Sequence, residues 1–443
     1  MKPIRQAAWV LFLGTIVSAV GCGGGSDDDD DGGDSAAEKL KAPTEVQVTA
    51  RGSSLLDVSW KDNSLDEDSF DVSYKNTNQE TAASAVAGAN ENRVTLSRLA
   101  PSTEYEVYVR ARKGTGRSAP SATVTATTGK LEWSILSTSG TKPPARVDHT
   151  LVMDTTQQRM IVFGGFDGIN VNLKTLALDL KSSTPSWSEI SSTAGPQRRL
   201  HSAVYDPVKK RMLVFGGYSY PPTNYYDELW ELSLSGSPTW KQLQVKGAVP
   251  SPRVAHSAIL DSAAKKMYVF GGVDSNGLDR NELFTLDLEQ DPPVWVSMNT
   301  GLQGPLPLPR YRHTAIHDRI KNQMIVYGGL PGPMNDVWAL NLEGGVPQWK
   351  NITPSGGTVP EGRSEHSAIF DKANHRMIVF GGVNNNGTKK DTWAFDLSAV
   401  TPSWTELVPP GTVPQNRGPA VADAVNQRLL FFGGSDDTYA LAH

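Results

Sequence analysis

The chain has 443 residues, which exceeds an ordinary domain of about 100–200 residues, so we expect several units or one large repeat array. Its 41 glycines and 29 prolines indicate many turns rather than long helices, and its single cysteine excludes an intrachain disulfide framework and a cysteine-rich metal cluster. A formal net charge of −5 provides no basic field for nucleic acid, and we expect no nucleic-acid partner.

Residues 1–21 have the pattern of an export signal. Lys2 and Arg5 form a short positive region ahead of an apolar run at residues 7–20. That run is too short to span a bilayer comfortably, but it suits the core of a signal peptide. We therefore expect residues 1–21 to be removed from the mature chain.

The only cysteine, Cys22, directly follows the small residues that end this signal. The order Ser-Ala-Val-Gly-Cys resembles the lipobox of bacterial lipoproteins, although Ser18 stands where that family more usually has Leu. The resemblance implies cleavage before Cys22, lipid modification of the cysteine and a membrane partner reached through this anchor. It also implies localisation in the bacterial cell envelope, where we expect the outer membrane, with the inner membrane as the alternative and the membrane face left open. The alternative is an ordinary secreted protein with an unmodified cysteine.

Residues 22–41 form an acidic tether in our interpretation. Glycines are followed by aspartates at residues 27–31 and by Asp34, and there is no apolar run. Such a segment cannot bury surface and repels itself, so we expect a flexible linker. A calcium loop is the alternative, but the alternating aspartates and the distal Glu of an EF-hand are missing.

Residues 42–129 show short runs of alternating apolar and polar residues, separated by turn residues. The runs at residues 56–60 and 105–109 are typical of strands that bury one face, as in an antiparallel sandwich. The segment resembles the fibronectin type III family, with Trp60 at its core position and residues 99–105 in its tyrosine-corner segment. The resemblance implies a spacer role, and the alternative is a binding role for the module itself.

Residues 130–443 repeat one pattern six times. Every repeat has a Gly-Gly pair at the end of an apolar run, and successive pairs are 52 to 57 residues apart. An aspartate precedes each pair, and the first five repeats add an Arg-x-x-His element before the pair and a Trp after it. The pairs are Gly164-Gly165, Gly216-Gly217, Gly271-Gly272, Gly328-Gly329, Gly381-Gly382 and Gly433-Gly434.

A period of about 52 residues with several short strands predicts a β-propeller, in which each blade is a four-stranded sheet. The repeated residues resemble the kelch repeat. The sixth repeat lacks a terminal Trp strand, whereas residues 133–136 supply an extra one before the first repeat, so we expect this strand to complete the sixth blade and close the ring. The predicted fold class is all-β: a fibronectin type III β-sandwich followed by a six-bladed kelch propeller, closed by an N-terminal Trp strand.

The arginines of the Arg-x-x-His elements are the first binding candidates. The kelch resemblance places them near the pocket face, where a ring of guanidiniums would suit carboxylates. The alternative is that they pair with local carboxylates, such as the repeated aspartates. The candidate ring consists of Arg146, Arg198, Arg253, Arg310 and Arg363, with Arg417 in the sixth repeat, where Arg-Gly-Pro-Ala replaces the pattern.

Departures from the repeat supply further candidates. The second blade has the longest loop after its Gly-Gly pair, with four tyrosines and two prolines that suit sugar rings or peptide side chains, although the loop could instead pack on its neighbour. The fourth blade adds two more polar side chains. These ligand-binding candidates are Tyr218, Tyr220, Tyr225, Tyr226, Tyr311 and Arg312.

The kelch resemblance implies a non-enzymatic binding module that recognises a protein or a glycan. We expect no cofactor, no metal, no catalytic residues and a monomer, since the repeated histidines belong to different blades. A copper radical oxidase would need a cysteine in the mature fold, which this chain lacks. The alternative function is a sugar mutarotase or epimerase, with Glu365 beside His366 as the acid–base candidate.

Overall fold

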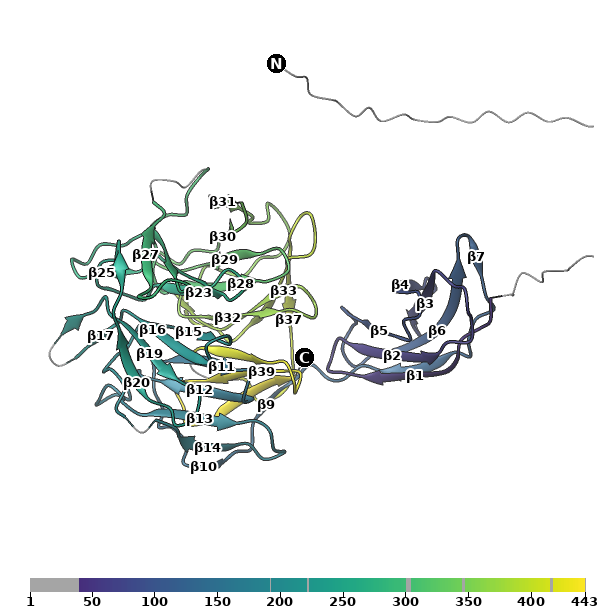
Figure 1. Ribbon diagram of the computed structural model, residues 1–443, viewed down its shortest axis with the longest axis horizontal. Coiled ribbons are helices and arrows are strands. Elements are labelled where there is room, and N and C mark those ends of the chain that lie inside the picture. Colours follow the sequence, from purple (N-terminus) through teal and green to yellow (C-terminus); the bar gives the residue numbers. More distant parts are fainter. Residues whose placement is uncertain are drawn as a thin grey trace, which may run out of the picture. The chain divides into compact units, whose positions relative to one another are not determined.

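The computed structural model describes residues 40–191, 193–220, 223–299, 304–344, 347–414 and 417–442. Cys22, the export segment and residues 22–39 of the acidic tether lie outside the described residues. The described ranges form strands, turns and loops without a helix, and so contain no helical segment long and apolar enough to cross a membrane. The predicted all-β fold class is confirmed (Figure 1).

The first strands form a two-sheet sandwich. One sheet consists of β1 (Thr44–Ala50), β2 (Leu56–Lys61) and β5 (Arg93–Leu96). The other consists of β4 (Ala83–Gly88), β3 (Ser69–Asn76), β6 (Glu104–Lys113) and β7 (Gly116–Arg117), with β8 (Val124–Thr127) also paired to β6.

Alternating apolar residues of both sheets form the core of this sandwich. Trp60 packs against Phe70 with ring centroids 5.2 Å apart, and Val107 and Val109 are fully buried. The Tyr105 hydroxyl accepts a hydrogen bond of 2.9 Å from the Ala100 amide, which is the geometry of a tyrosine corner. The expected core tryptophan and tyrosine corner are therefore both present.

Each propeller blade is a four-stranded antiparallel sheet (Figure 1). Blades 1 to 3, from inside to outside, are β11 (Thr150–Asp154), β12 (Arg159–Phe163), β13 (Thr175–Asp179), β14 (Ser186–Glu189); β15 (Ser202–Asp206), β16 (Arg211–Phe215), β19 (Leu229–Ser233), β20 (Trp240–Leu243); and β23 (Ser257–Asp261), β24 (Lys266–Phe270), β26 (Leu283–Asp287), β27 (Val294–Ser297). Blades 4 to 6 are β28 (Thr314–Asp318), β29 (Gln323–Tyr327), β30 (Val337–Asn341), β31 (Gln348–Asn351); β32 (Ser367–Asp371), β33 (Arg376–Phe380), β36 (Thr392–Asp396), β37 (Trp404–Leu407); and β38 (Ala420–Asp423), β39 (Arg428–Phe432), β40 (Thr438–Ala442), β9 (Trp133–Ile135).

Short strands decorate these blades. Two of them extend a blade outward in parallel pairing. The others form small ladders at the loops that follow the Gly-Gly pairs, one of them with a strand, β22, from the segment before β23. The outer additions are β10 (Ser139–Gly140) on blade 1 and β21 (Lys246–Gly247) on blade 3, and the loop strands are β17 (Tyr218–Ser219), β18 (Asn224–Tyr225), β22 (Arg253–Val254), β25 (Val273–Asp274), β34 (Val383–Asn384) and β35 (Gly387–Thr388).

The ring closes as expected, because β9 is the outer strand of blade 6. It pairs antiparallel with β40, in the register Trp133 with Leu441 and Ser134 with Ala440. The Gly434 amide also donates a 2.9 Å hydrogen bond to the Arg146 carbonyl, which links blade 6 to blade 1. The innermost strands contact one another around the whole ring, since β38 contacts β11 as well as β32.

The repeated tryptophans pack neighbouring blades together. Each outer-strand Trp contacts the aromatic residue that precedes the Gly-Gly pair of the preceding blade, with centroid distances of 4.3 to 5.6 Å. The six pairs are Trp187–Phe432, Trp240–Phe163, Trp295–Phe215, Trp349–Phe270, Trp404–Tyr327 and Trp133–Phe380.

The Gly-Gly pairs are required by close backbone approach. At Gly165, φ is 84°, and an added Cβ would lie 2.6 Å from both the Val147 carbonyl oxygen and the His149 Cβ. The same glycine donates its amide to the Arg198 carbonyl of the next blade at 2.9 Å. Only a residue without a side chain satisfies both conditions without displacement.

Candidate functional site

The five arginines of the Arg-x-x-His elements are buried between strands and do not line the central cavity described below. Their exposed fractions are 3% or less. Arg310 donates to the Gly328 carbonyl at 3.1 Å and forms a bidentate ion pair with Asp336 at 2.8 and 2.7 Å. Arg253, Arg310 and Arg363 therefore hold the Gly-Gly turn against the start of the third strand, rather than presenting guanidiniums to a ligand. The set is Arg146, Arg198, Arg253, Arg310 and Arg363.

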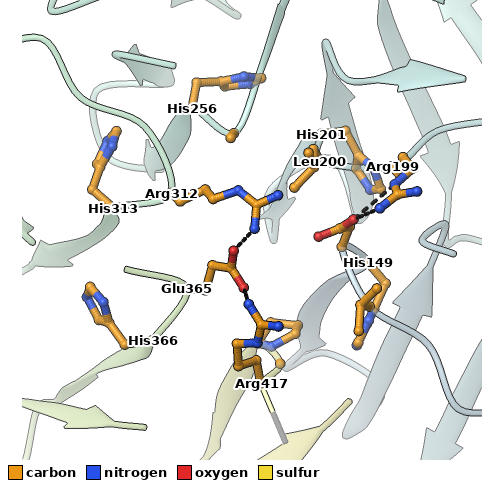
Figure 2. Close-up of a pocket in the computed structure, with 15 residues that line it drawn as sticks. His149, Arg199, Leu200, His201, His256, Arg312, His313, Glu365, His366 and Arg417 are labelled. Carbon is orange, nitrogen blue, oxygen red and sulfur yellow. Dashed lines mark hydrogen bonds and ion pairs between the residues drawn. The ribbon is translucent and has the colours of Figure 1, made fainter. Parts of the chain in front are cut away.

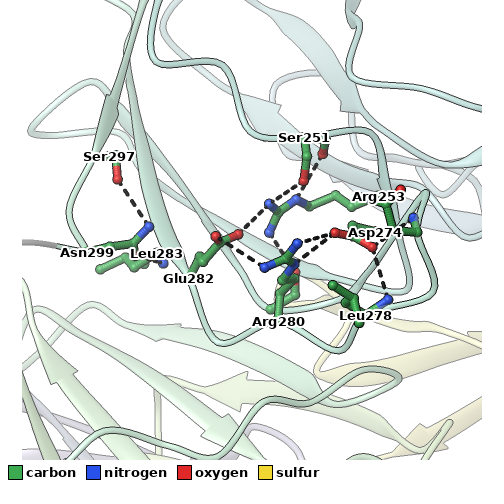
Figure 3. A network of polar contacts seen from close by, with 11 residues as sticks. Ser251, Arg253, Asp274, Leu278, Arg280, Glu282, Leu283, Ser297 and Asn299 are labelled. Carbon is green, nitrogen blue, oxygen red and sulfur yellow. Dashed lines mark hydrogen bonds and ion pairs between the residues drawn. The ribbon is translucent and has the colours of Figure 1, made fainter.

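Local carboxylates are the partners of four of these arginines, as the alternative interpretation had it, but these carboxylates are not the repeated aspartates. Arg253 pairs with Glu282 at 2.8 Å and also donates to the Ser251 hydroxyl. Arg280 extends this network, since it lies 3.9 Å from the Glu282 carboxylate and forms an ion pair with Asp274 (Figure 3). The partners of Arg198 and Arg363 are likewise the acidic residues just before the third strand, Glu228 and Asp391. Arg146 is bound through the Gly164 carbonyl, and burial lowers its pKa to about 10.

The repeated aspartates instead cap the turn between the first two strands of each blade. In blade 1, Asp154 accepts hydrogen bonds from the amides of Thr156 and Gln157, and it pairs with Arg159 at 2.9 Å. This turn lies at the opposite end of the strands from the Arg-x-x-His element. The aspartates are therefore structural.

A cavity of about 370 Å³ lies on the propeller axis. One repeat position lines it in all six blades: the residue just before the repeated histidine, and Arg417 at the matching distance from Gly433 in blade 6. Arg417 therefore occupies the cavity position, and not the position of the five buried arginines with which its sequence context grouped it. The six residues are Asp148, Leu200, Ala255, Arg312, Glu365 and Arg417.

A left-handed backbone turns this position toward the axis. In the first five blades φ lies between 54° and 58°, a conformation that non-glycine residues rarely adopt. Backbone hydrogen bonds of 2.9 to 3.0 Å connect the position from blade to blade, each amide donating to the carbonyl of the preceding blade. The chain of bonds runs from Glu365 to Arg312, Ala255, Leu200 and Asp148. This inner ring compensates for the strained dihedral angles.

The cavity has a charged side, lined by blades 4 to 6, and an apolar side, lined by blades 1 to 3, which contains one ion pair whose charges cancel. Glu365 forms ion pairs with both Arg312 and Arg417, across blades 4, 5 and 6 (Figure 2). A second pair joins Arg199 to Asp148, with Arg199 Nε 2.9 Å from Asp148 Oδ2. The rest of the lining includes the apolar residues Val147, Leu200 and Ala255. The arrangement suits an anionic group attached to an apolar one.

The five repeated histidines support the walls as neutral groups. His149 donates from Nε2 to the Phe432 carbonyl at 3.0 Å, since a carbonyl can only accept. The others share hydrogen bonds of 2.6 to 2.9 Å with a hydroxyl of the preceding blade: His201 with Thr150, His256 with Ser202, His313 with Ser257 and His366 with Thr314. Burial lowers the pKa of His149, His201, His256 and His366 to about 3 and that of His313 well below its ordinary value.

These contacts also bear on the proposed acid–base pair. Glu365 is engaged by two guanidiniums, and His366 is buried, neutral and bonded to Thr314. Both side chains are therefore engaged by partners other than each other. Among the described residues, no three His, Cys, Asp or Glu side chains are grouped to hold a metal ion.

The tyrosine hairpin borders this cavity through Arg199. Tyr218 and Tyr225, on β17 and β18, stack with ring centroids 5.8 Å apart and planes 22° apart. The Arg199 guanidinium, in the cavity wall, lies 5.3 Å from the Tyr218 ring and 4.6 Å from the Phe166 ring. Tyr220 at the turn is 55% exposed.

Two other tyrosines have structural contacts. The guanidinium of the buried Arg198 lies 3.3 Å from the centroid of the Tyr226 ring. The Tyr226 hydroxyl shares a hydrogen bond with the Ser219 hydroxyl. Tyr311 forms a two-way backbone bridge with Leu330 and is not among the residues that line the cavity. Of the candidates, Arg312 and Arg417 therefore line the cavity, and Tyr218 contacts its wall through Arg199. Tyr225 stacks on Tyr218, and Tyr220 is exposed at the turn of the hairpin.

Three charged cavity residues did not emerge as binding candidates from the sequence: Asp148, Arg199 and, as an ion-pair partner, Glu365. For Asp148 and Glu365 the available signal was variation at a single repeat position, which reads Asp, Leu, Ala, Arg, Glu and Arg in the six blades, whereas Arg199 lies one residue before this position. A position that varies between blades is free of the common packing requirement.

The six four-stranded blades, with their buried arginines and histidines and their paired tryptophans, define a kelch-type β-propeller protein. The chain belongs to the family described as the KLHDC2/KLHL20/DRC7 Kelch-repeats domain, whose model matches residues 111–238, 207–356 and 320–442. The fibronectin type III domain model matches residues 41–127.

Similar curated proteins come from plants and animals. Adagio protein 3 of Arabidopsis thaliana is 26% identical over 317 residues, which cover 68% of this chain and 49% of that protein. Host cell factor 2 of Homo sapiens is 30% identical over 345 residues (69% of this chain, 41% of that protein), and host cell factor 1 of Mus musculus is 29% identical over 333 residues (67% and 16%). The chain thus spans half or less of the length of these relatives.

Proposed function

We propose that this chain is a binding protein whose propeller recognises a protein partner on the face that carries the central cavity and the tyrosine hairpin. The observation that carries the proposal is the position of Arg199, which lies in the cavity wall and beneath Tyr218 at once. The charged cavity and the aromatic hairpin therefore form one continuous surface.

The chemistry of this surface favours a polypeptide ligand. Exposed tyrosines supply contact area at low conformational cost, and arginines bind carboxylates with defined geometry. The apolar side of the cavity adds room for an aliphatic side chain beside the charge. A glycan ligand is the second candidate, because the stacked Tyr218 and Tyr225 offer a ring face to a sugar.

The same proposal places the protein in the bacterial cell envelope, at the outer membrane. Cys22 carries the lipid anchor, residues 22–41 are the tether, and the fibronectin type III domain is a spacer. A Cys22→Ala variant of the full chain is expected to leave the membrane fraction. Recovery of that variant in the membrane fraction at the wild-type level would refute lipidation.

Site-specific photocrosslinking in cells tests the binding face. A photoreactive amino acid at Tyr220 is expected to capture a protein partner, and an Arg312→Ala/Arg417→Ala background is expected to abolish the capture. The matched control is Val208, which is 63% exposed and lies in a turn at the other end of the blade 2 strands. Equal capture from both positions, or capture unaffected by the arginine changes, would contradict the proposal. A glycan array with the full chain, positive while crosslinking is negative, would replace the protein ligand with a carbohydrate.

A further inference from the structure

Three consecutive blades place Arg312, Glu365 and Arg417 at the same repeat position, where the carboxylate lies between the two guanidiniums (Figure 2). Glu365 Oε1 pairs with Arg312, and Oε2 pairs with Arg417. A guanidinium has five N–H donors, so each arginine retains donors that these pairs do not use. The side chains of Arg417 and Arg312 are 44% and 27% exposed, so both remain accessible from the cavity.

The charges around the cavity nearly cancel. Arg199 and Asp148 neutralise each other, and the buried histidines are neutral. Arg312 and Arg417 share one carboxylate, so this side of the cavity keeps a surplus of one positive charge. Without Glu365 the surplus would be two.

We propose that Glu365 sets the charge selectivity of the cavity, so that it accepts a single carboxylate and disfavours a dianion such as a phosphate group. A monoanion neutralises the surplus, whereas a dianion reverses it and also faces the Glu365 carboxylate at short range. Like charges in a partly desolvated cavity repel strongly. This inference rests on the proposed function, because it assigns ligand chemistry to the same surface.

The apolar side of the cavity specifies the source of the carboxylate. Val147, Leu200 and Ala255 belong to blades 1, 2 and 3, where the charges of Asp148 and Arg199 are paired with each other, whereas the arginine pair belongs to blades 4 and 6. A ligand that uses both sides carries an acidic group beside an aliphatic one. An acidic side chain next to an aliphatic residue of a polypeptide meets this description better than a sugar acid, which is polar on all sides.

Calorimetric titration of the full chain with short blocked peptides tests the assignment. The probes are acetyl-Ala-Leu-Glu-Ala-amide, its phosphoserine counterpart, which carries nearly two negative charges at pH 7, and glucuronate. The wild-type chain is expected to bind the glutamate peptide more tightly than the phosphopeptide. Glu365→Gln is expected to shift the ratio of the two dissociation constants at least tenfold toward the phosphopeptide.

Asp148→Asn is the matched control, because it removes one negative charge at the same repeat position but away from the Arg312–Arg417 pair. An equal shift in Asp148→Asn would overturn the assignment to Glu365 and leave net charge as the cause. Tighter binding of the phosphopeptide to the wild-type chain would overturn the inference even if Glu365→Gln failed to fold. The inference would also be overturned if neither peptide bound. Binding of glucuronate alone would overturn the assignment of the carboxylate to a polypeptide. Any of these results, together with partner capture that depends on Arg312 and Arg417, would leave the proposed protein-binding function in place.

Discussion

Trp133 packs against Phe380 with ring centroids 4.7 Å apart, although the two residues are far apart in the sequence. Trp133 begins β9, the strand that follows the sandwich, and Phe380 ends the second strand of blade 5. Because β9 is the outer strand of blade 6, this contact joins the last two blades through a residue from the start of the propeller. The ring is complete only when both of its sequence ends are in place.

Removal of the Trp133 ring is therefore expected to destabilise the whole propeller. Trp133→Ala should lower the free energy of unfolding by about 3–5 kcal/mol, the usual cost of truncating a buried aromatic side chain. Ile135, on the same strand, is 47% exposed, and Ile135→Ala should cost about 0.5 kcal/mol or less. Denaturant unfolding of both variants checks this. Equal losses of unfolding free energy in the two variants would show that the strand as a whole, and not the tryptophan contact, stabilises the closed ring.

Two glycines of blade 1 with similar backbone conformations test the role of close packing at the Gly-Gly turn. Gly165 and Gly168 both have positive φ, 84° and 99°, but an added Cβ meets neighbours at 2.6 Å at Gly165 and nothing within 4 Å at Gly168. Gly165→Ala should therefore cost about 2 kcal/mol more than Gly168→Ala, because it adds a clash to the same dihedral strain. Thermal melting of the two variants measures the difference, and similar melting temperatures would contradict the role assigned to the close approach.

Arg310 and Arg312 are two residues apart, but substitution of Arg310 should mainly reduce stability, whereas substitution of Arg312 should mainly reduce ligand binding. Arg310→Ala leaves Asp336 without its bidentate partner and should cost about 3 kcal/mol of stability. Burial alone would raise the pKa of Asp336, but the hydrogen bonds and the charge of Arg310 have the larger combined effect and lower this pKa. The ion pair therefore stabilises the ionised carboxylate. Arg312→Ala removes a partly exposed pair and should cost about 1 kcal/mol or less, while it weakens ligand binding. Unfolding curves and the crosslinking assay separate the two effects, and a large stability loss in Arg312→Ala would assign it a structural role.

The buried histidines predict acid lability. Burial holds the pKa of His149, His201, His256 and His366 near 3, against an ordinary value of 6.5. The unfolded chain therefore takes up protons from about pH 6.5 downward, and the folded chain does so only near pH 3. The free energy of unfolding should thus be fully present above pH 6.5 and should fall as the pH decreases through this window, by about 2 kcal/mol per histidine at pH 5.

Denaturant midpoints between pH 7.5 and pH 5 measure this loss. His256→Gln should reduce the pH dependence by about one proton, whatever its effect at pH 7.5. A midpoint that is constant between these pH values would contradict the burial of neutral histidines.

Much of the architecture could be predicted from local patterns. The Gly-Gly pairs, the Asp turns and the Trp strands each act within one hairpin or between neighbouring blades, so every repeat displays its own requirements in the sequence. The count of six Gly-Gly strands and five later Trp strands, with an extra Trp strand at residues 133–136, was sufficient to predict closure.

The candidate site could be predicted only in part, because the sequence shows two arginines near each other without showing which one is exposed. Arg310 and Arg312 have the same side chain, yet Arg310 is buried against Asp336 while a φ of 54° turns Arg312 toward the axis. Arg417 was grouped with the wrong repeat position for the same reason, since blade 6 replaces the histidine with Gly418. The pairing of β38 with β39 established its register.

The sequence by itself thus determined the sandwich, the number of blades and the strand that closes the ring, because these depend on short-range patterns that recur. The tertiary structure alone decided which side chains meet at the axis. Six residues from six blades converge there, and their ion pairs depend on backbone dihedral angles and on neighbours more than fifty residues away, such as Glu365 and Arg417. The repeat pattern marks the variable position in the sequence, but it does not show which of these side chains pair with one another.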